Sequence, residues 1–163
     1  MSSTLFVDAI EPNLSSGVHI AGHVIQVVHT SSNTQAAASS GTLLSLTGLA
    51  TSITPKYATS KMLIDVSLAL QLIGANTGVK LIAYRNGSVI QNSINSWEIY
   101  QTITGATMGD QYSRPSWLLQ DSPNSTSSVG YAFALSGYSG GGTWAINPSN
   151  SFTSFIRIME IAQ

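Results

Sequence analysis

Residues 61–73, KMLIDVSLALQLI, decide the fold class of this 163-residue chain. Every second position in this stretch is apolar: Met62, Ile64, Val66, Leu68, Leu70 and Leu72. A two-residue period is typical of a β-strand, whereas a helix would spread the same side chains around its circumference. The stretch is long for one strand, so we expect a bulge or bend inside it.

The rest of the chain reads in the same way. Asn86-Gly87 lies between two alternating apolar segments, a pattern typical of a hairpin with a type I′ turn. We expect the polar stretch 31–42 to form a loop, and no stretch has the pattern of a convincing helix. Further strands are expected at 22–30, 43–55 (with a turn at Gly48), 97–104, 116–120, 128–140, 143–146 and 151–163. The sequence therefore predicts an all-β, antiparallel sandwich or barrel.

The composition excludes several classes of function. Only 8% of the residues are charged, against about 25% in a typical soluble domain, and the net charge is -1. No basic surface is therefore expected to attract nucleic acid or anionic lipid. The chain has no cysteine for disulfides or thiolate metal sites, no secretory signal pattern and no apolar stretch long enough to cross a bilayer as a helix.

The chain divides into two segments. Residues 1–21 read as an extended arm that Pro12 and Gly17 interrupt, and residues 22–163 form the expected β-sandwich domain.

Few residues suggest catalysis or metal binding. His19, His23 and His29 have the same parity, but Gly22 interrupts the stretch and no carboxylate lies nearby to complete a metal site. The acidic residues are scattered, and no nucleophile elbow or phosphate-binding loop is present. We expect no enzyme activity, no cofactor and no metal site. One alternative is a metal held on a symmetry axis by a ring of these histidines from several subunits. The enzymatic alternative is a polysaccharide hydrolase whose carboxylate pair assembles only in the fold.

Aromatic side chains near loops are candidates for glycan contact. Trp97, Tyr138 and Trp144 could stack on sugar rings, with the many Ser, Thr and Asn side chains supplying hydrogen bonds to hydroxyls. The alternative for each of them is packing inside the sandwich or at an interface.

The last stretch, SFTSFIRIMEIAQ (151–163), is apolar on both faces of the expected strand. Ile156 and Ile158 can fill the core, while Phe155, Met159 and Ile161 need cover on the other side. Such a face is typical of an interface, and Arg157 on it would need Glu160, Asp65 or a carbonyl group as its partner.

The stretch GHVIQVVHT (22–30) has the same two-faced character, with Val24 and Val28 on one face and Ile25 and Val27 on the other. We therefore expect the first and last strands of the sandwich to lie side by side near an oligomer axis.

Several stretches carry a resemblance to known proteins. VDAIEPN (7–13), GHVIQVV (22–28), TGLATSITPKYATSKMLIDVSLAL (47–70), YRNGSVI (84–90) and SFIRIMEI (154–161) together resemble the C-terminal domains of marine and cyanobacterial phage tail fibres and related small virion proteins. The resemblance covers nearly the whole chain, and it lies in the order of the strand motifs.

The resemblance implies a homotrimeric, jelly-roll-like β-sandwich of the tumour-necrosis-factor/C1q type on the exterior of a phage virion, made in the host cytoplasm. The subunit interface would contain Val24, Val28, Phe155, Arg157, Met159 and Ile161. The arm would dock onto another virion protein of the capsid or tail through Leu5, Phe6, Val7 and Ile10. A full tail fibre usually has a shaft and a tail-attachment domain, which this sequence does not contain, so we expect either a complete small virion protein or a fragment of a fibre. The expected role is that of a structural component of the capsid decoration, head or tail fibre. The alternative is a fibre tip that attaches to the host by binding a receptor or surface polysaccharide.

Overall fold

The computed structural model describes residues 20–39, 41–92, 99–101, 110–138 and 142–163. Within these ranges the chain forms β-strands and one short 3-10 turn, η1 (Thr47–Leu49). The strands are β1 (Val24–Ser32), β2 (Ala36–Ser39), β3 (Leu43–Ser45), β4 (Thr51–Ile53), β5 (Lys61–Ser67), β6 (Leu70–Ile73), β7 (Thr77–Arg85), β8 (Ser88–Asn92), β9 (Ile99–Gln101), β10 (Gln111–Ser113), β11 (Ser116–Asp121), β12 (Val129–Gly137), β13 (Thr143–Ile146) and β14 (Ser154–Ile161).

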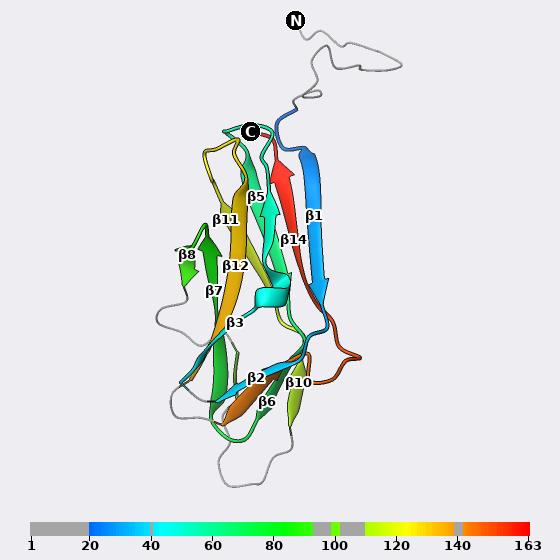
Figure 1. Cartoon of the computed structure of the whole chain (residues 1–163), viewed down its shortest axis with the longest axis vertical. Coiled ribbons are helices and arrows are strands. Elements are labelled where there is room, and N and C mark those ends of the chain that lie inside the picture. The colour runs from blue at the N-terminus through cyan, green and yellow to red at the C-terminus, as the bar shows by residue number, and fades with distance from the viewer. Residues whose placement is uncertain (1–19, 40, 93–98, 102–109, 139–141) are drawn as a thin grey trace, which may run out of the picture.

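The strands form two antiparallel layers (Figure 1). In the first layer the order is β1-β14-β5-β11, and the order β2-β13-β6-β10 repeats it at the other end because each long strand is broken in two. The second layer has the order β3-β12-β7-β8, with β4 also pairing with β12 and β9 with β7. The chain crosses between the layers as in a jelly roll, so the expected all-β, jelly-roll-like sandwich is confirmed, and β1 and β14 are neighbours as predicted.

The hydrophobic core lies between the layers. The six alternate apolar residues of 61–73 are all at most 1% exposed, which confirms the two-residue period. The expected bend falls at Leu68 and Ala69, between β5 and β6. From the second layer, Tyr131, Phe133 and Leu135 of β12 fill the same core. Removing this much apolar surface from water is the main force that holds the sandwich together.

The turn at Asn86-Gly87 was predicted from the sequence, and the strand β2 was not. Asn86 and Gly87 have φ angles of 49° and 82°, so the hairpin between β7 and β8 has the predicted type I′ turn. The prediction of a loop over 31–42 is wrong, because β1 continues to Ser32 and β2 occupies Ala36–Ser39. Alanine and serine have little intrinsic preference for strands, and β2 forms because it pairs with β13.

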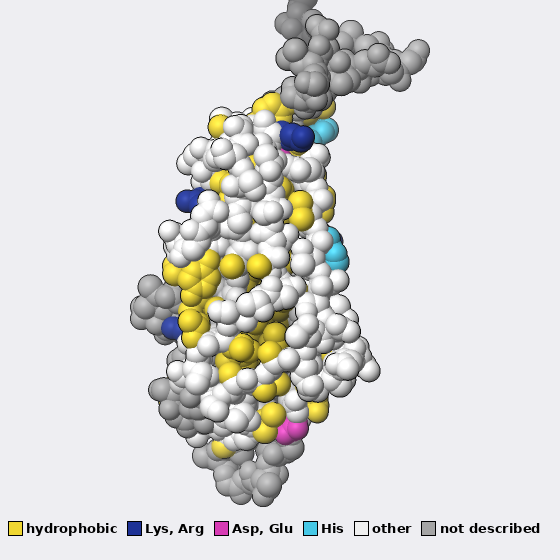
Figure 2. All heavy atoms as spheres, viewed as in Figure 1, with side chains coloured by type: hydrophobic (Ala, Val, Ile, Leu, Met, Phe, Trp, Pro, Cys, Tyr) yellow, Lys and Arg dark blue, Asp and Glu magenta, His cyan; other side chains and the backbone are white. Residues whose placement is uncertain are grey.

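The surface is polar with few charges. Figure 2 shows uncharged polar side chains and backbone over much of one side of the molecule, with hydrophobic groups in its middle and only isolated basic, acidic and histidine side chains. This agrees with the low charge content of the sequence.

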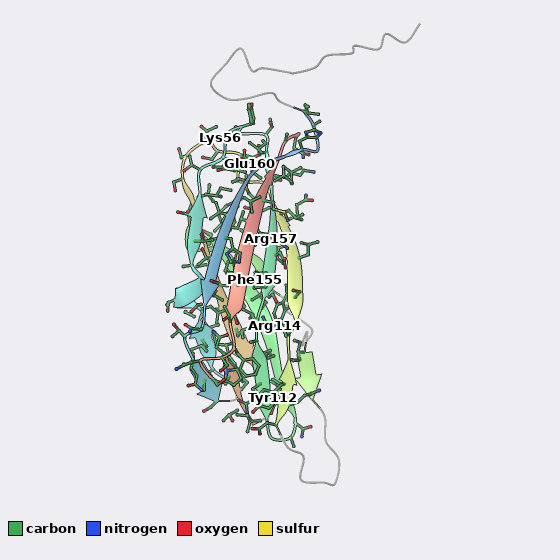
Figure 3. The ribbon with its side chains drawn as sticks, turned by 90° about the vertical axis from the view of Figure 1, so that its right-hand side faces the viewer. Lys56, Tyr112, Arg114, Phe155, Arg157 and Glu160 are labelled. Atoms are coloured by element: carbon green, nitrogen blue, oxygen red, sulfur yellow. The ribbon has the colours of Figure 1, made fainter. Side chains whose placement is uncertain are left out.

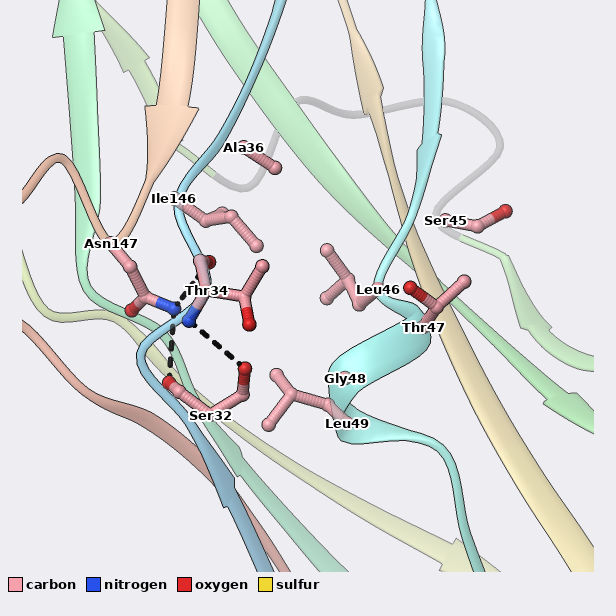
Figure 4. A pocket seen from close by; sticks show the side chains of 10 residues that line it. All are labelled: Ser32, Thr34, Ala36, Ser45, Leu46, Thr47, Gly48, Leu49, Ile146 and Asn147. Carbon is pink, nitrogen blue, oxygen red and sulfur yellow. Dashed lines mark hydrogen bonds between the residues drawn. The ribbon is translucent and has the colours of Figure 1, made fainter. Parts of the chain in front are cut away.

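A buried polar network stabilises the break in the first layer (Figure 4). Asn147, which is completely buried, donates from Nδ2 to the carbonyl oxygens of Ser32 and Thr34, both at 3.0 Å. Its Oδ1 accepts a hydrogen bond of 2.8 Å from the hydroxyl of Ser154, and that hydroxyl accepts one of 2.9 Å from the backbone N–H of Ala69. The network thus joins the points at which three of the long strands change direction.

Candidate functional site

The outward side of the first layer is the strongest candidate for a functional surface. Along β14, Ile156 and Ile158 are completely buried in the core, as predicted. Phe155, Met159 and Ile161 point the other way and stay half-buried in the single chain, so the two-faced character of this strand is confirmed.

Strand register arranges the outward side chains in rows across the layer (Figure 3). Each row runs from β1 towards β11. The first row is His29, Arg157, Asp65 and Leu118, and the second is Val27, Met159, Leu63 and Gln120. The third row is Val24, Ile161 and Lys61, and it ends at β5. These residues, together with Phe155, are called the β14 face below. Its members come from four strands that are far apart in the sequence, so only the fold brings them together.

The β14 face exposes apolar groups at both of its edges. Val24 and Val27 on β1 are 51% and 53% exposed, and Leu118 on β11 is 67% exposed. Near the β11 edge the face is hollowed by about 310 Å³, and the hollow is lined by Lys61, Leu63, Gln120, Ile161 and Gln163. Exposed apolar side chains gathered on one face are typical of a protein–protein interface.

One ion pair lies in the middle of this face. Nη2 of Arg157 is 2.7 Å from Oδ2 of Asp65, and the Asp65 side chain is only 17% exposed. Asp65 was one of the partners predicted for Arg157. A guanidinium and a carboxylate that are already paired can enter an interface without leaving an unpaired charge there.

The prediction that Val24 and Val28 share a face is wrong. The pairing of β1 with β14 contains a β-bulge between Val24 and Gln26, and the extra residue reverses the alternation at that point. Val24 therefore lies outward, opposite Ile161. Val28 lies opposite Ile158 and packs against the core of its own chain, so it does not belong to an outward interface.

Glu160 turns inward, away from Arg157, and fixes the end of the molecule where β1 begins. Its carboxylate is completely buried. Oε1 accepts hydrogen bonds from the backbone N–H groups of Lys56 (2.8 Å) and Tyr57 (3.3 Å). Oε2 accepts one of 2.5 Å from Nε2 of Gln26. The carboxylate thus ties β14 to β1 and to the loop that follows β4.

A second polar cluster joins the two layers. Nη1 of Arg85 on β7 lies 2.8 Å from Oδ1 of Asp121 on β11. The hydroxyl of Tyr131 on β12 donates to Oδ2 of the same carboxylate at 2.7 Å. Burial, and then the hydrogen bond to Asp121, raise the pKa of Tyr131 well above its usual range.

Of the three expected glycan contacts, the structure describes Trp144 and Tyr138. Trp144 is completely buried on β13, so it cannot stack on a sugar, and that prediction is wrong. It was placed near a loop, but its side chain points into the core, where a Cβ on Gly137 would lie only 2.3 Å from its Nε1. Tyr138 is half-buried at the end of β12, and Trp97 lies outside the described residues.

The proposed anchoring residues, Leu5, Phe6, Val7 and Ile10, also lie outside the described residues. Among the residues that the structure describes, no three His, Asp or Glu side chains gather closely enough to hold a metal ion. His29 instead places its ring 5.7 Å from that of Phe155. In the same described ranges, no helix is long and apolar enough to cross a membrane.

Comparison with known proteins shows the fold. No protein-family model and no curated protein matches the sequence. Among solved structures, a chain of the infectious bursal disease virus Gt strain matches 97% of this chain with a TM-score of 0.50 and 9% identity. The VP2 subviral particle of the same virus matches 98% of it, with a TM-score of 0.44 and 9% identity. This chain spans only 42% and 43% of those two chains, and what it shares with the first of them is the β-sandwich fold.

Proposed function

We propose that this chain is a structural protein on the exterior of a phage virion. It forms a homotrimer through the β14 face, and its arm, residues 1–21, anchors the trimer to another protein of the capsid or tail. The fold supports this proposal because a virus chain shares it over nearly the full length of this sequence.

The observation that carries the proposal is the composition of the β14 face. Val24, Val27 and Leu118 are each more than half exposed in the single chain, and Met159 and Ile161 lie between them. Burial of a valine or leucine side chain contributes about 1.5–3 kcal/mol when it is complete. Cover from a second copy would therefore stabilise the assembly by several such contributions.

The two edges of the face differ, which favours a closed ring. The β1 edge presents Val24 and Val27, which protrude, and the β11 edge holds the hollow next to Leu63 and Gln120. A contact between different edges of successive copies is heterologous, and such contacts close into rings when the rotation allows it. We expect Val24 and Val27 of one copy to lie near the hollow of the next.

Light scattering on the purified protein tests the trimer directly. We expect a native mass of three times the chain mass of 17.1 kDa. Val27→Glu should reduce it to the mass of one chain, because a carboxylate would be buried without a partner. Val89→Glu is the matched control, since Val89 is 51% exposed and lies on β8 in the other layer. A monomeric wild type, or equal effects of the two substitutions, would refute the proposed interface.

Removal of the arm tests the anchoring. A variant that lacks residues 1–21 should keep the trimeric mass and fail to enter phage particles when it is supplied during infection. Efficient incorporation of this variant would show that the arm is not the anchor.

Host attachment is the second candidate role, through binding of a receptor or surface polysaccharide. A hollow on the outward side of the second layer favours it, because that layer lies opposite the β14 face and would stay exposed in the trimer.

A further inference from the structure

The second layer carries an open hollow of about 170 Å³ on its outward side. It is lined by Ser45, Leu46, Thr47, Ala50, Tyr84, Ala132 and Phe133. Figure 2 shows hydrophobic side chains at the surface in the region of β12 and β3.

The hollow follows from an interruption in strand pairing. β12 pairs with β4 over Val129–Tyr131 and with β3 over Ala134–Ser136. Between these two segments the chain leaves the sheet as η1, so Ala132 has a strand neighbour on only one side, where it lies opposite Tyr84 of β7. The alanine methyl group is too small to fill the space above it.

The lining combines apolar and hydroxyl groups. Ala50 and Ala132 give exposed methyl groups, and the half-exposed ring of Tyr84 forms one wall. Ser45 and Thr47 are exposed and add hydroxyl groups at the rim. Within the described part of the chain, neither of these two hydroxyls nor that of Tyr84 makes a side-chain hydrogen bond, so all three are available to a ligand.

We propose that this hollow binds one neutral hexose unit of a glycan. A pyranose ring has an apolar C–H face, which fits the tyrosine ring and the alanine floor, and hydroxyl groups at its edge, which fit Ser45 and Thr47. None of the lining residues is charged, so the hollow favours a neutral sugar over an acidic one. Its volume is below the roughly 300–1,000 Å³ of pockets for drug-sized ligands and suits a single ring.

The formation of this site does not depend on the proposed trimer, but the affinity of the protein for a polysaccharide would depend on it. Because the hollow and the β14 face belong to opposite layers, a trimer would present three copies of the hollow at once. A single sugar held by one hollow should bind weakly, and binding to a repeating polysaccharide would then be strengthened by multivalency.

Titration with methyl glycosides of glucose, galactose, mannose and N-acetylglucosamine, followed by NMR, tests the proposal. We expect saturable binding of at least one of them in the millimolar range, and none of N-acetylneuraminic acid. Ala132→Val, which fills the floor, and Tyr84→Ala, which removes the wall, should each weaken binding at least tenfold. Ser136→Val is the matched control, because Ser136 lies on the same side of β12 and outside the hollow.

Thermal unfolding and native mass of each variant separate loss of the site from loss of the fold or of the trimer. Absence of saturable binding by the wild type to all four glycosides would overturn the proposal. So would a correctly folded Ala132→Val variant that binds as well as the Ser136→Val control. Neither result would bear on the trimer, which the Val27→Glu experiment tests on the other layer.

Discussion

Asn147→Ala should cost this fold about 4 kcal/mol of unfolding free energy. The substitution removes two hydrogen bonds of 3.0 Å to carbonyl groups and one of 2.8 Å from Ser154, each contributing about 1 kcal/mol. Asn147 also has a φ of 45°, and the left-handed region costs alanine about a further 1 kcal/mol. At about 2–4 °C per kcal/mol for a chain of this size, the midpoint of thermal unfolding should fall by about 8–16 °C.

Asn124→Ala separates the two contributions. Asn124 has a similar φ of 51° but lies exposed between β11 and β12, so its substitution should cost only the backbone part, about 1 kcal/mol. Both variants would be followed by circular dichroism at the same protein concentration. If Asn147→Ala were no more destabilising than Asn124→Ala, the buried network would not hold the bend in the first layer, and the reasoning would fail.

Three further predictions concern side chains that the fold buries. Glu160→Gln should lower the free energy of unfolding by about 2 kcal/mol, because the new amide N–H₂ would face the N–H donors of Lys56, Tyr57 and Gln26. An unchanged midpoint of thermal unfolding would contradict these contacts. Because folding raises the pKa of Tyr131 above its ordinary value of 10.0, its contribution to stability is fully present below pH 10 and should decline as the pH rises further. Urea unfolding between pH 9 and 11 would measure this decline, which Tyr131→Phe should reduce. Trp144→Ala should cost about 3–5 kcal/mol by emptying the core, whereas a surface tryptophan would leave the urea midpoint nearly unchanged.

Local sequence patterns predicted those parts of the sheet whose structure depends mainly on one local feature, such as alternation or a turn sequence. The alternation in 61–73 reports burial directly, since each of those positions faces either the core or the outside. The Asn86-Gly87 turn was predictable because few other residue pairs accept two consecutive positive φ angles. The adjacency of β1 and β14 was predicted from their shared two-faced composition, and the antiparallel pairing of the two strands confirms it.

Other features depend on pairing that no local pattern contains. The bulge between Val24 and Gln26 exists only relative to β14, and it reverses the side on which Val24 lies. β2 is a strand because β13 supplies its hydrogen bonds, although its alanines and serines favour no strand. The strand at 143–146 was predicted, but the sequence did not show on which face its tryptophan lies, and β13 turns the Trp144 indole into the core.

The candidate sites were likewise predictable from the sequence only in part. The part of the β14 face that lies on the last strand was predictable, since Phe155, Arg157, Met159 and Ile161 alternate there. The part that β5 and β11 contribute was not, because only the strand register places Leu63 and Leu118 beside that strand. The hollow beside Tyr84 had no signal in the sequence, because it arises where β12 changes its partner from β4 to β3.

The charges of the β14 face are placed in a way that is compatible with the proposed subunit contact. On the β14 face, Arg157 and Asp65 pair with each other, so the centre of the face can be covered without a new counter-ion. Lys61 lies in the outermost row next to the hollow, and it makes no ion pair with another described residue. Its long side chain can keep the ammonium group in water while its stem lies against an apolar neighbour. In the proposed trimer a partner subunit should therefore bury the Val27 and Met159 row most deeply and leave Lys61 at the rim of the contact, with the second layer facing outward.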